Sequence, residues 1–227
     1  RYSAVSVSPL VFDHSRRKQA TFLACRPCPV YCPPCQTDKH MKTLILGSAS
    51  ERRRTILADL GVPFEVFAPD VTETFYADDP KRTALENARR KHEACKRRFP
   101  DRPIITADTI VAFEGQCVTK PESLAAAAGF LRMFSGRQQV VYTALALSVP
   151  SAEPDVDIVE STVVFRTLTE PAIREYLAAV NPLDKAGGYD IDQRGDLIVE
   201  SYSGSYTNIM GLPAEAVAAW LTKEGLR

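Results

Sequence analysis

From residue 42 onward, blocks of apolar residues with two different spacings alternate along the chain. Continuous apolar runs predict buried strands over residues 42–46, 64–68, 104–107, 110–113, 138–149, 158–166 and 197–203. Apolar residues at helical spacing predict helices over residues 50–60, 81–98, 124–133, 170–180 and 213–222. The runs 138–149 and 158–166 flank a loop with two prolines, so we expect them to pair antiparallel. This order predicts an α/β fold with a mixed central sheet flanked by helices.

Residues 1–40 lack this periodicity. They hold six Lys or Arg against two Asp, together with several Pro and Ser. Their four cysteines, Cys25 to Cys35, are too closely spaced for a structural zinc site, whose pairs usually lie about 12–20 residues apart. We therefore interpret residues 1–40 as a tail, disordered or a non-native upstream segment, and residues 41–227 as one folded domain beginning near Met41.

The overall charge constrains the kind of partner. The chain has 28 basic and 28 acidic side chains, so its formal net charge is zero, which disfavours nucleic acid as a partner. No apolar run is long enough for a membrane span, and no secretory signal is recognisable, so we expect a cytoplasmic protein. Any site for an anion must therefore be local.

One such site is suggested by LILGSASERRRTILADLGV, residues 44–62. Ser48 and Ser50 lie in the turn between a strand and a helix, and Arg52 and Arg53 lie in the first helical turn. Backbone N–H groups and the helix dipole attract anions there, whereas basic side chains oppose the dipole. The unfavourable placement of the arginines is explained if they bind phosphate, although a solvated basic helix face is the alternative.

Two carboxylates and two lysines are further candidates. Asp108 interrupts an apolar run, where it either caps a turn or, at the end of a buried strand, holds Mg²⁺ or activates water. Glu73 follows the second strand and is a candidate to join it at a metal. Lys91 lies on an otherwise apolar helical stripe, where it must extend to solvent or meet an anion. Lys120 follows a turn and is a candidate phosphate ligand.

A glycine-rich segment, residues 181–213, is the last candidate. Glycines there either form tight turns or allow the backbone to approach a ligand closely. Lys185 precedes Gly187-Gly188, and Asp190, Asp192 and Gln193 are candidates to contact a base edge. With arginines, lysines and metal-competent acids in one chain, the chemistry that fits is attack of water on a nucleoside triphosphate at the α–β phosphoanhydride.

Six segments, in this order, resemble the Maf family: LILGSASERRRTILADLGVPFEVFAPDVTE, ADTIVAFEGQCVTKPES, FLRMFSGRQQVVYTALAL, FRTLTEPAIREY, PLDKAGGYDID and GSYTNIMGLP. The resemblance spans residues 42–222. It implies two lobes with an intervening cleft, as in inosine triphosphate pyrophosphatases. It further implies hydrolysis of nucleoside triphosphates to monophosphate and pyrophosphate with a divalent metal, Mg²⁺ or else Mn²⁺ or Co²⁺, and a homodimer.

The resemblance also assigns residues. It places catalytic roles on Asp108, Glu73, Lys120 and Arg52, with Glu73 and Asp108 as metal ligands, and it places substrate contacts on Ser48, Ser50, Arg53, Lys91 and Thr109. The glycine-rich segment adds Lys185 and Asp192 as candidate substrate contacts. Where dTTP/UTP-cleaving members read Gly-Ile-Gln, this chain has Asp190-Ile191-Asp192. An ionised aspartate only accepts hydrogen bonds, which favours a guanine-like edge. We expect dTTP and UTP as substrates; the alternatives are 7-methyl-GTP and a non-catalytic nucleotide- or nucleic-acid-binding regulator of cell division.

Overall fold

The computed structural model describes residues 43–227. The tail, Met41 and the four clustered cysteines lie outside the described residues, so the predictions made for them stay predictions. The strands are β1 Leu44–Leu46, β2 Phe64–Val66, β3 Ile104–Phe113, β4 Gln116–Val118, β5 Gln138–Ser148, β6 Asp155–Phe165 and β7 Val199–Ser203. The helices are α1 Glu51–Asp59, α2 Pro80–Arg98, α3 Leu124–Phe134, α4 Glu170–Ala179, α5 Tyr206–Ile209 and α6 Ala214–Lys223, with short 3-10 turns η1 Ala186–Gly188 and η2 Gly195–Leu197.

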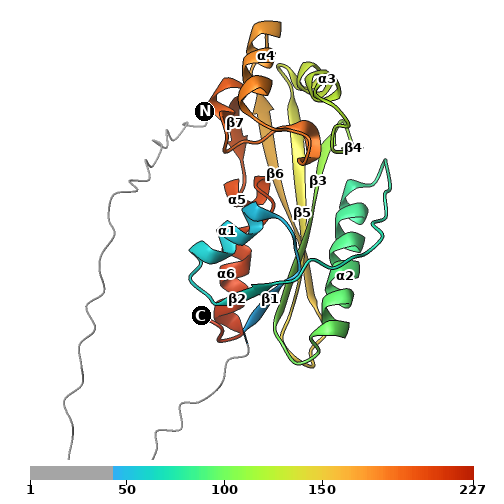
Figure 1. Cartoon of the computed structure of the whole chain (residues 1–227), viewed down its shortest axis with the longest axis vertical. Helices are drawn as coiled ribbons and strands as arrows, with labels where there is room; N and C mark the ends of the chain where they lie inside the picture. Colours follow the sequence, from blue (N-terminus) through green and yellow to red (C-terminus); the bar gives the residue numbers. More distant parts are fainter. Residues whose placement is uncertain (1–42) are drawn as a thin grey trace, which may run out of the picture. The chain divides into compact units, whose positions relative to one another are not determined.

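All seven strands form one mixed sheet in the order β2-β1-β3-β5-β6-β7, with β4 also paired to β3 (Figure 1). The strands β2, β1 and β3 are parallel, and the remaining pairs are antiparallel. Along one edge of β3, pairing with β1 stops at Ile105 and pairing with β4 starts at Val111. The backbone between these two residues has no strand neighbour on that side, which leaves a notch in the sheet.

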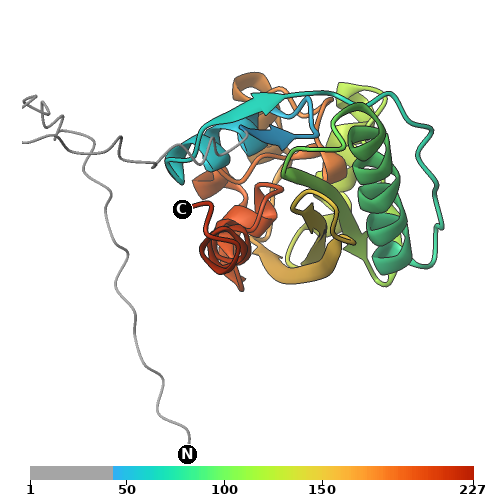
Figure 2. The ribbon, with the colours of Figure 1, turned by 90° about the horizontal axis from the view of Figure 1, so that it is seen from below.

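Helices cover both faces of the sheet, as the view from below shows (Figure 2). The α2 helix packs through small residues, Ala84 and Ala88, against Ala144 and Ala146 of β5, which allows the helix to approach the sheet closely. On the opposite face, α1 and α6 pack with β1, β3 and β5 around Leu57 and Trp220.

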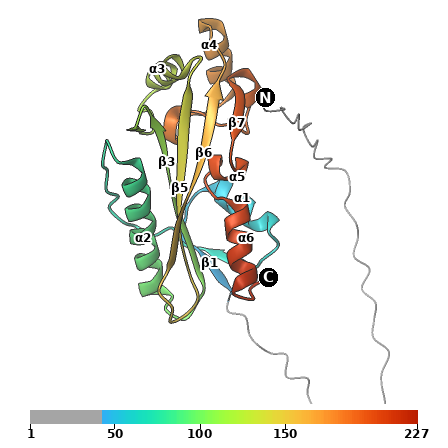
Figure 3. The same ribbon diagram turned by 180° about the vertical axis from the view of Figure 1, so that it is seen from behind.

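The long strands β3, β5 and β6 run through two lobes (Figure 3). One lobe holds the cluster of α1, α6, β1 and the nearby half of the sheet. The other contains Phe134 and Phe165 in a core formed with α3, α4 and β7. These features confirm the predicted mixed α/β architecture with two lobes.

The helix ends explain why the helices begin where they do. Asp79 caps α2 by accepting a hydrogen bond from the Arg82 backbone, and Pro80 occupies the first helical turn. Ser123 caps α3 in the same way. Among residues 43–227, no helix has the length and apolar character that crossing a membrane requires.

The interpretation of Asp108 as a residue that ends a strand is wrong. β3 continues without interruption from Ile104 to Phe113, and Asp108 pairs with Ala144 of β5 at its centre. Its carboxylate is tolerated there because side chains of a strand alternate between faces and Asp108 faces a polar partner on α2. Sequence reasoning also missed β4 and the single turn of α5.

Candidate active site

A cavity of about 560 Å³ opens at the notch beside β3. Its walls come from the N-terminus of α1, the loop that follows β2, α2, the middle of β3, the loop after β4, the η1 region and the segment around Gly211. Seven separate parts of the chain thus contribute to one cavity, and its lining combines charged groups with apolar ones.

Arg53 extends from α1 into the notch, where all three of its side-chain nitrogens donate hydrogen bonds to the protein. Its Nε donates to the Gly211 carbonyl at 2.7 Å and its Nη1 to the Ala107 carbonyl at 2.9 Å. Further bonds reach the hydroxyls of Ser48 at 3.2 Å and Thr109 at 2.9 Å. The Ala107 carbonyl is one of the groups that the missing strand neighbour leaves unpaired, so Arg53 satisfies the sheet edge with its guanidinium.

Within the part of the chain that the structure describes, Arg52 makes an ion pair and not a set of hydrogen bonds to the backbone. It lines the cavity, and its Nη1 lies 3.7 Å from the buried Asp190 carboxylate. The neighbouring Arg54 points away and pairs with Glu51 one helical turn earlier at 2.9 Å. Of the three consecutive arginines, Arg52 is therefore the one whose guanidinium faces the cavity with donors available for an anion.

Glu73 and Asp108 meet through Lys91. The Lys91 ammonium lies 2.6 Å from Glu73 Oε1 and 2.6 Å from Asp108 Oδ1. Its side chain is 15% exposed and that of Asp108 only 8% exposed, whereas Glu73 extends to solvent at the cavity mouth. The prediction that Lys91 must meet an anion or reach solvent is thus resolved in favour of two anions.

The two carboxylates have different electrostatic environments. Burial raises the pKa of Asp108 above its usual value, although Lys91 acts in the opposite direction. Partial burial by itself would raise the pKa of Glu73, but the hydrogen bond from Lys91 and the positive charges of Lys91, Lys120 and Arg53 together lower it. A pair of acids whose pKa values are driven apart suits one acid to proton transfer and the other to permanent negative charge.

The donor set at this point fits a hard divalent cation. Glu73 and Asp108 each bond Lys91 through one oxygen, which brings the two carboxylates close together, and oxygen atoms are the ligands that Mg²⁺ prefers. Among residues 43–227, no cluster of three or more His, Cys, Asp or Glu side chains could enclose a metal alone. A cation held by Glu73 and Asp108 would therefore take its other ligands from water and from the phosphates of a substrate.

The cavity collects most, but not all, of the candidate residues. Those that line it are Arg52, Arg53, Ser50, Glu73, Lys91, Asp108, Thr109 and Lys120. Ser48 lies just behind, where its hydroxyl accepts hydrogen bonds from the Ser50 backbone and from Arg53. Lys185 is buried, and its ammonium bonds to Asp184 Oδ1 at 2.8 Å and to the Asn181 carbonyl at 3.1 Å. Asp192 accepts a hydrogen bond from the Tyr206 hydroxyl at 3.2 Å and does not line the cavity.

Sequence reasoning missed Asn87. It lies on α2 one turn before Lys91, and its amide both accepts from the Thr74 backbone at 2.8 Å and donates to the Thr74 carbonyl at 3.0 Å. A further contact reaches Asp108 Oδ2 at 3.4 Å. Asn87 therefore fixes the loop that carries Glu73 and places it beside Asp108. The available signal was its spacing of four residues from Lys91, which puts both side chains on one helix face.

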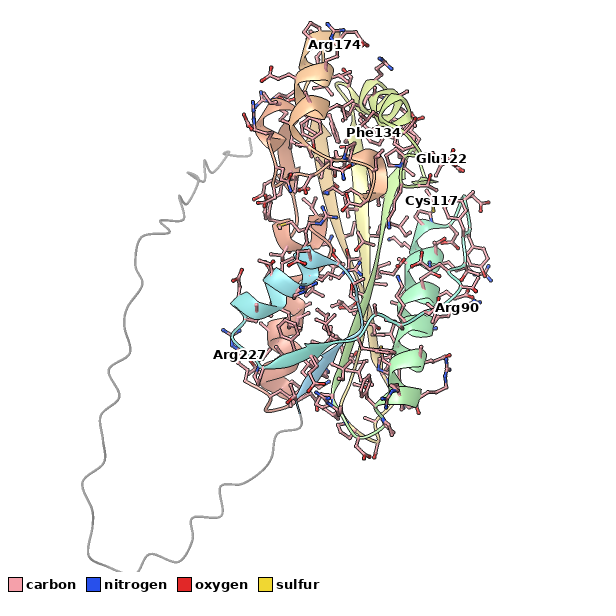
Figure 4. The ribbon with its side chains drawn as sticks, in the orientation of Figure 1. Arg90, Cys117, Glu122, Phe134, Arg174 and Arg227 are labelled. Carbon is pink, nitrogen blue, oxygen red and sulfur yellow. The ribbon has the colours of Figure 1, made fainter. Side chains whose placement is uncertain are left out.

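Apolar side chains that line the same cavity also escaped the sequence analysis. They are Ile110, Val111, Val118, Ala186, Tyr189, Ile191, Ile209 and Met210. Figure 4 labels Cys117 on the β3–β4 hairpin and Glu122 in the loop that follows it, and this loop lines the cavity. The Cys117 backbone donates to the Ala77 carbonyl at 2.8 Å, which joins that hairpin to the loop carrying Glu73.

A cavity in an α/β fold that is lined by cations, two carboxylates and apolar side chains is typical of enzymes that act on phosphorylated ligands. A sequence model of the Maf family, described as Maf-like protein, matches residues 43–224. The chain belongs to this family.

Two relatives are similar in sequence to the chain over most of their own length. The chain is 40% identical over 183 residues to a Deinococcus radiodurans protein named dTTP/UTP pyrophosphatase, a match that covers 81% of this chain and 93% of that protein. A Moorella thermoacetica protein of the same name is 40% identical over 188 residues, covering 82% and 97%. Among solved structures, the Staphylococcus aureus Ham1 protein aligns with a TM-score of 0.48 and 16% identity over 81% of this chain and 100% of that one.

Proposed function

We propose that this protein hydrolyses nucleoside triphosphates to nucleoside monophosphates and pyrophosphate, with dTTP and UTP as the preferred substrates. The observation that carries the proposal is the convergence of Arg52, Lys91, Asp108 and Glu73 in one cavity that apolar side chains also line. Apolar side chains in the lining suit contact with a base, and the cationic side chains suit a triphosphate. The choice of dTTP and UTP rests on the names of relatives that are 40% identical to the chain.

In the mechanism that we propose, Arg52 and Lys120 contact the phosphates and stabilise the charge that develops on them. Asp108 accepts the proton of the attacking water, a role that its raised pKa supports. Lys91 holds Asp108 and Glu73 in fixed orientations. Arg53 supports the cavity wall, because each of its three side-chain nitrogens already donates to the protein.

A divalent cation, Mg²⁺ with Mn²⁺ or Co²⁺ as substitutes, would be held by Glu73 and Asp108 and would neutralise phosphate charge. Direct substrate contacts of Ser48, Lys185 and Asp192 stay predictions, since none of these residues lines the cavity. The same holds for a homodimer, for the cytoplasm as the place of action, and for the expectation that nucleic acid is not a partner.

The deciding experiment measures pyrophosphate release from dTTP, UTP, CTP, GTP and 7-methyl-GTP with Mg²⁺. Pyrophosphate is assayed separately from orthophosphate, because release of orthophosphate alone would mean cleavage at a different phosphoanhydride. We expect the highest kcat/KM for dTTP and UTP, and loss of activity on chelation of the metal with recovery when Mg²⁺ is restored. Asp108→Asn serves as the inactive reference.

The same panel separates the alternatives. A preference for 7-methyl-GTP would assign the chain to that substrate and would return Asp192 to consideration as a base contact. Pyrophosphate release from none of the five nucleotides, with a folded protein and intact nucleotide binding, would refute the enzymatic proposal and leave a binding function.

A further inference from the structure

Asp190 has a buried carboxylate whose role the proposed reaction does not explain. Its side chain is 2% exposed, and it lies behind the cavity wall. Two cations flank its Oδ2 atom: Arg52 Nη1 at 3.7 Å and Lys185 Nζ at 3.8 Å. A carboxylate removed from water needs such partners, since an unpaired buried charge strongly destabilises a fold.

The protein holds Asp190 rigidly. The Tyr176 hydroxyl of α4 accepts a hydrogen bond from the Asp190 backbone N–H at 2.7 Å and donates one to the Asp190 carbonyl at 2.9 Å. Tyr176 itself is fully buried. The Asp190 Oδ1 atom accepts from the Asp192 backbone at 3.0 Å, so both the backbone and the side chain are fixed.

The two cations differ in their freedom to respond to Asp190. The Lys185 ammonium is already bonded to Asp184 and to the Asn181 carbonyl. Arg52 has a side chain that is 30% exposed, it lines the cavity, and Asp190 is the only carboxylate in residues 43–227 with which it forms an ion pair. Arg52 thus has one ion-pair partner among the described residues, and that partner is held in a fixed position, while Asp184 in the cavity lining also attracts Arg52 electrostatically.

We propose that Asp190 is a positioning residue that orients Arg52 toward the phosphates of the substrate. Asp190 engages the guanidinium through Nη1, and the remaining N–H groups of Arg52 can then meet a phosphate as a preset fork. Holding a long side chain in place before binding removes an entropic cost from the binding step. The proposal rests on the proposed function for its catalytic consequence, but its binding consequence can be measured without turnover.

The test combines Asp190→Asn and Arg52→Ala, singly and together. Asp190→Asn preserves the shape of the side chain and the acceptor for the Asp192 backbone while removing the charge. Asp196→Asn is the matched control, because Asp196 is exposed, pairs with Arg194 at 3.9 Å and does not line the cavity. Thermal unfolding of each variant establishes that it is folded. Calorimetry then measures the affinity for inorganic tripolyphosphate in buffer with Mg²⁺, and pyrophosphate release gives kcat and KM.

We expect Asp190→Asn to weaken tripolyphosphate binding and to lower kcat/KM by roughly three- to tenfold, which is the range for ordering one long side chain. Both effects should disappear in the Arg52→Ala background, because Asp190 then has no arginine to orient. Asp196→Asn should resemble the wild type in both measurements.

Tighter binding by Asp190→Asn would overturn the proposal, since it would mean that Asp190 acts only as a charge that repels the polyanion. An equal loss with and without Arg52 would overturn it too, as would no change in either background or no binding of tripolyphosphate by the wild type. If the wild type binds tripolyphosphate but releases no pyrophosphate from nucleotides, the proposed function fails while the binding cycle still decides the role of Asp190.

Discussion

Arg53→Lys is expected to destabilise the fold, although it keeps the charge. Arg53 donates to two backbone carbonyls, those of Ala107 and Gly211, and to two hydroxyls. The hydroxyls have other partners: Thr109 also bonds to Thr143, and Ser48 accepts from the Ser50 backbone. The net loss therefore lies in the carbonyls, which face different parts of the chain and which a single ammonium cannot replace together.

A hydrogen bond to a charged group contributes about 1.5–3 kcal/mol, so losing one carbonyl partner lowers the free energy of unfolding by about 2–3 kcal/mol. For a domain of this size, that corresponds to a fall in Tm of roughly 5–10 °C. Urea denaturation followed by tryptophan fluorescence and by circular dichroism measures the change. The slope of the free energy against urea should match that of the wild type.

Arg54→Lys is the control, because Arg54 is exposed and its pair with Glu51 spans one helical turn, which is worth under about 0.5 kcal/mol. If Arg53→Lys and Arg54→Lys unfold at the same urea concentration, the hydrogen bonds of Arg53 to the two carbonyls do not stabilise the sheet edge.

Asp108→Asn should lower kcat by at least about a hundredfold while the protein stays folded, because the amide cannot accept the proton of water; unchanged turnover would remove Asp108 from the reaction. Arg52→Lys should lower kcat/KM by about tenfold or more, since an ammonium replaces a fork with a point charge, and an equal kcat/KM would show that geometry does not matter there. His92 has a pKa lowered to about 4 by burial, so its stabilising contribution is present above its unfolded pKa of about 6.5 and is lost as the pH falls through 4. His92→Gln should therefore make the free energy of unfolding less dependent on pH between 7 and 4, and a profile parallel to that of the wild type would contradict this.

Periodicity in the sequence was sufficient to predict most elements within one to three residues. The exceptions have local physical reasons. β4 is only three residues long and α5 is a single turn, so neither shows a period. Asp108 suggested a strand end because a carboxylate is rare within a buried strand. Its partner, Lys91, lies on a helix that sequence alone does not place against that strand.

Part of the candidate site could also be predicted from the sequence. Charged residues at unfavourable positions, such as Arg52 and Lys91, indicated an anion, and the structure brings them to one cavity. The sequence could not show that Arg53 bonds to backbone carbonyls while Arg52 faces the cavity. This difference depends on the carbonyls of Ala107 and Gly211, which are backbone groups and have no residue-type signature.

The bond from Arg53 to the carbonyl of Gly211 joins positions 158 residues apart. During synthesis, the part of the cavity that contains Arg53 therefore stays incomplete until the segment around Gly211, which leaves the ribosome much later, has been made. A truncated product that stops before residue 205 lacks Gly211 and the side chains of Ile209 and Met210, and so cannot complete the cavity. Incomplete chains should for this reason be unable to degrade nucleotides, and activity should arise only once translation has passed this segment.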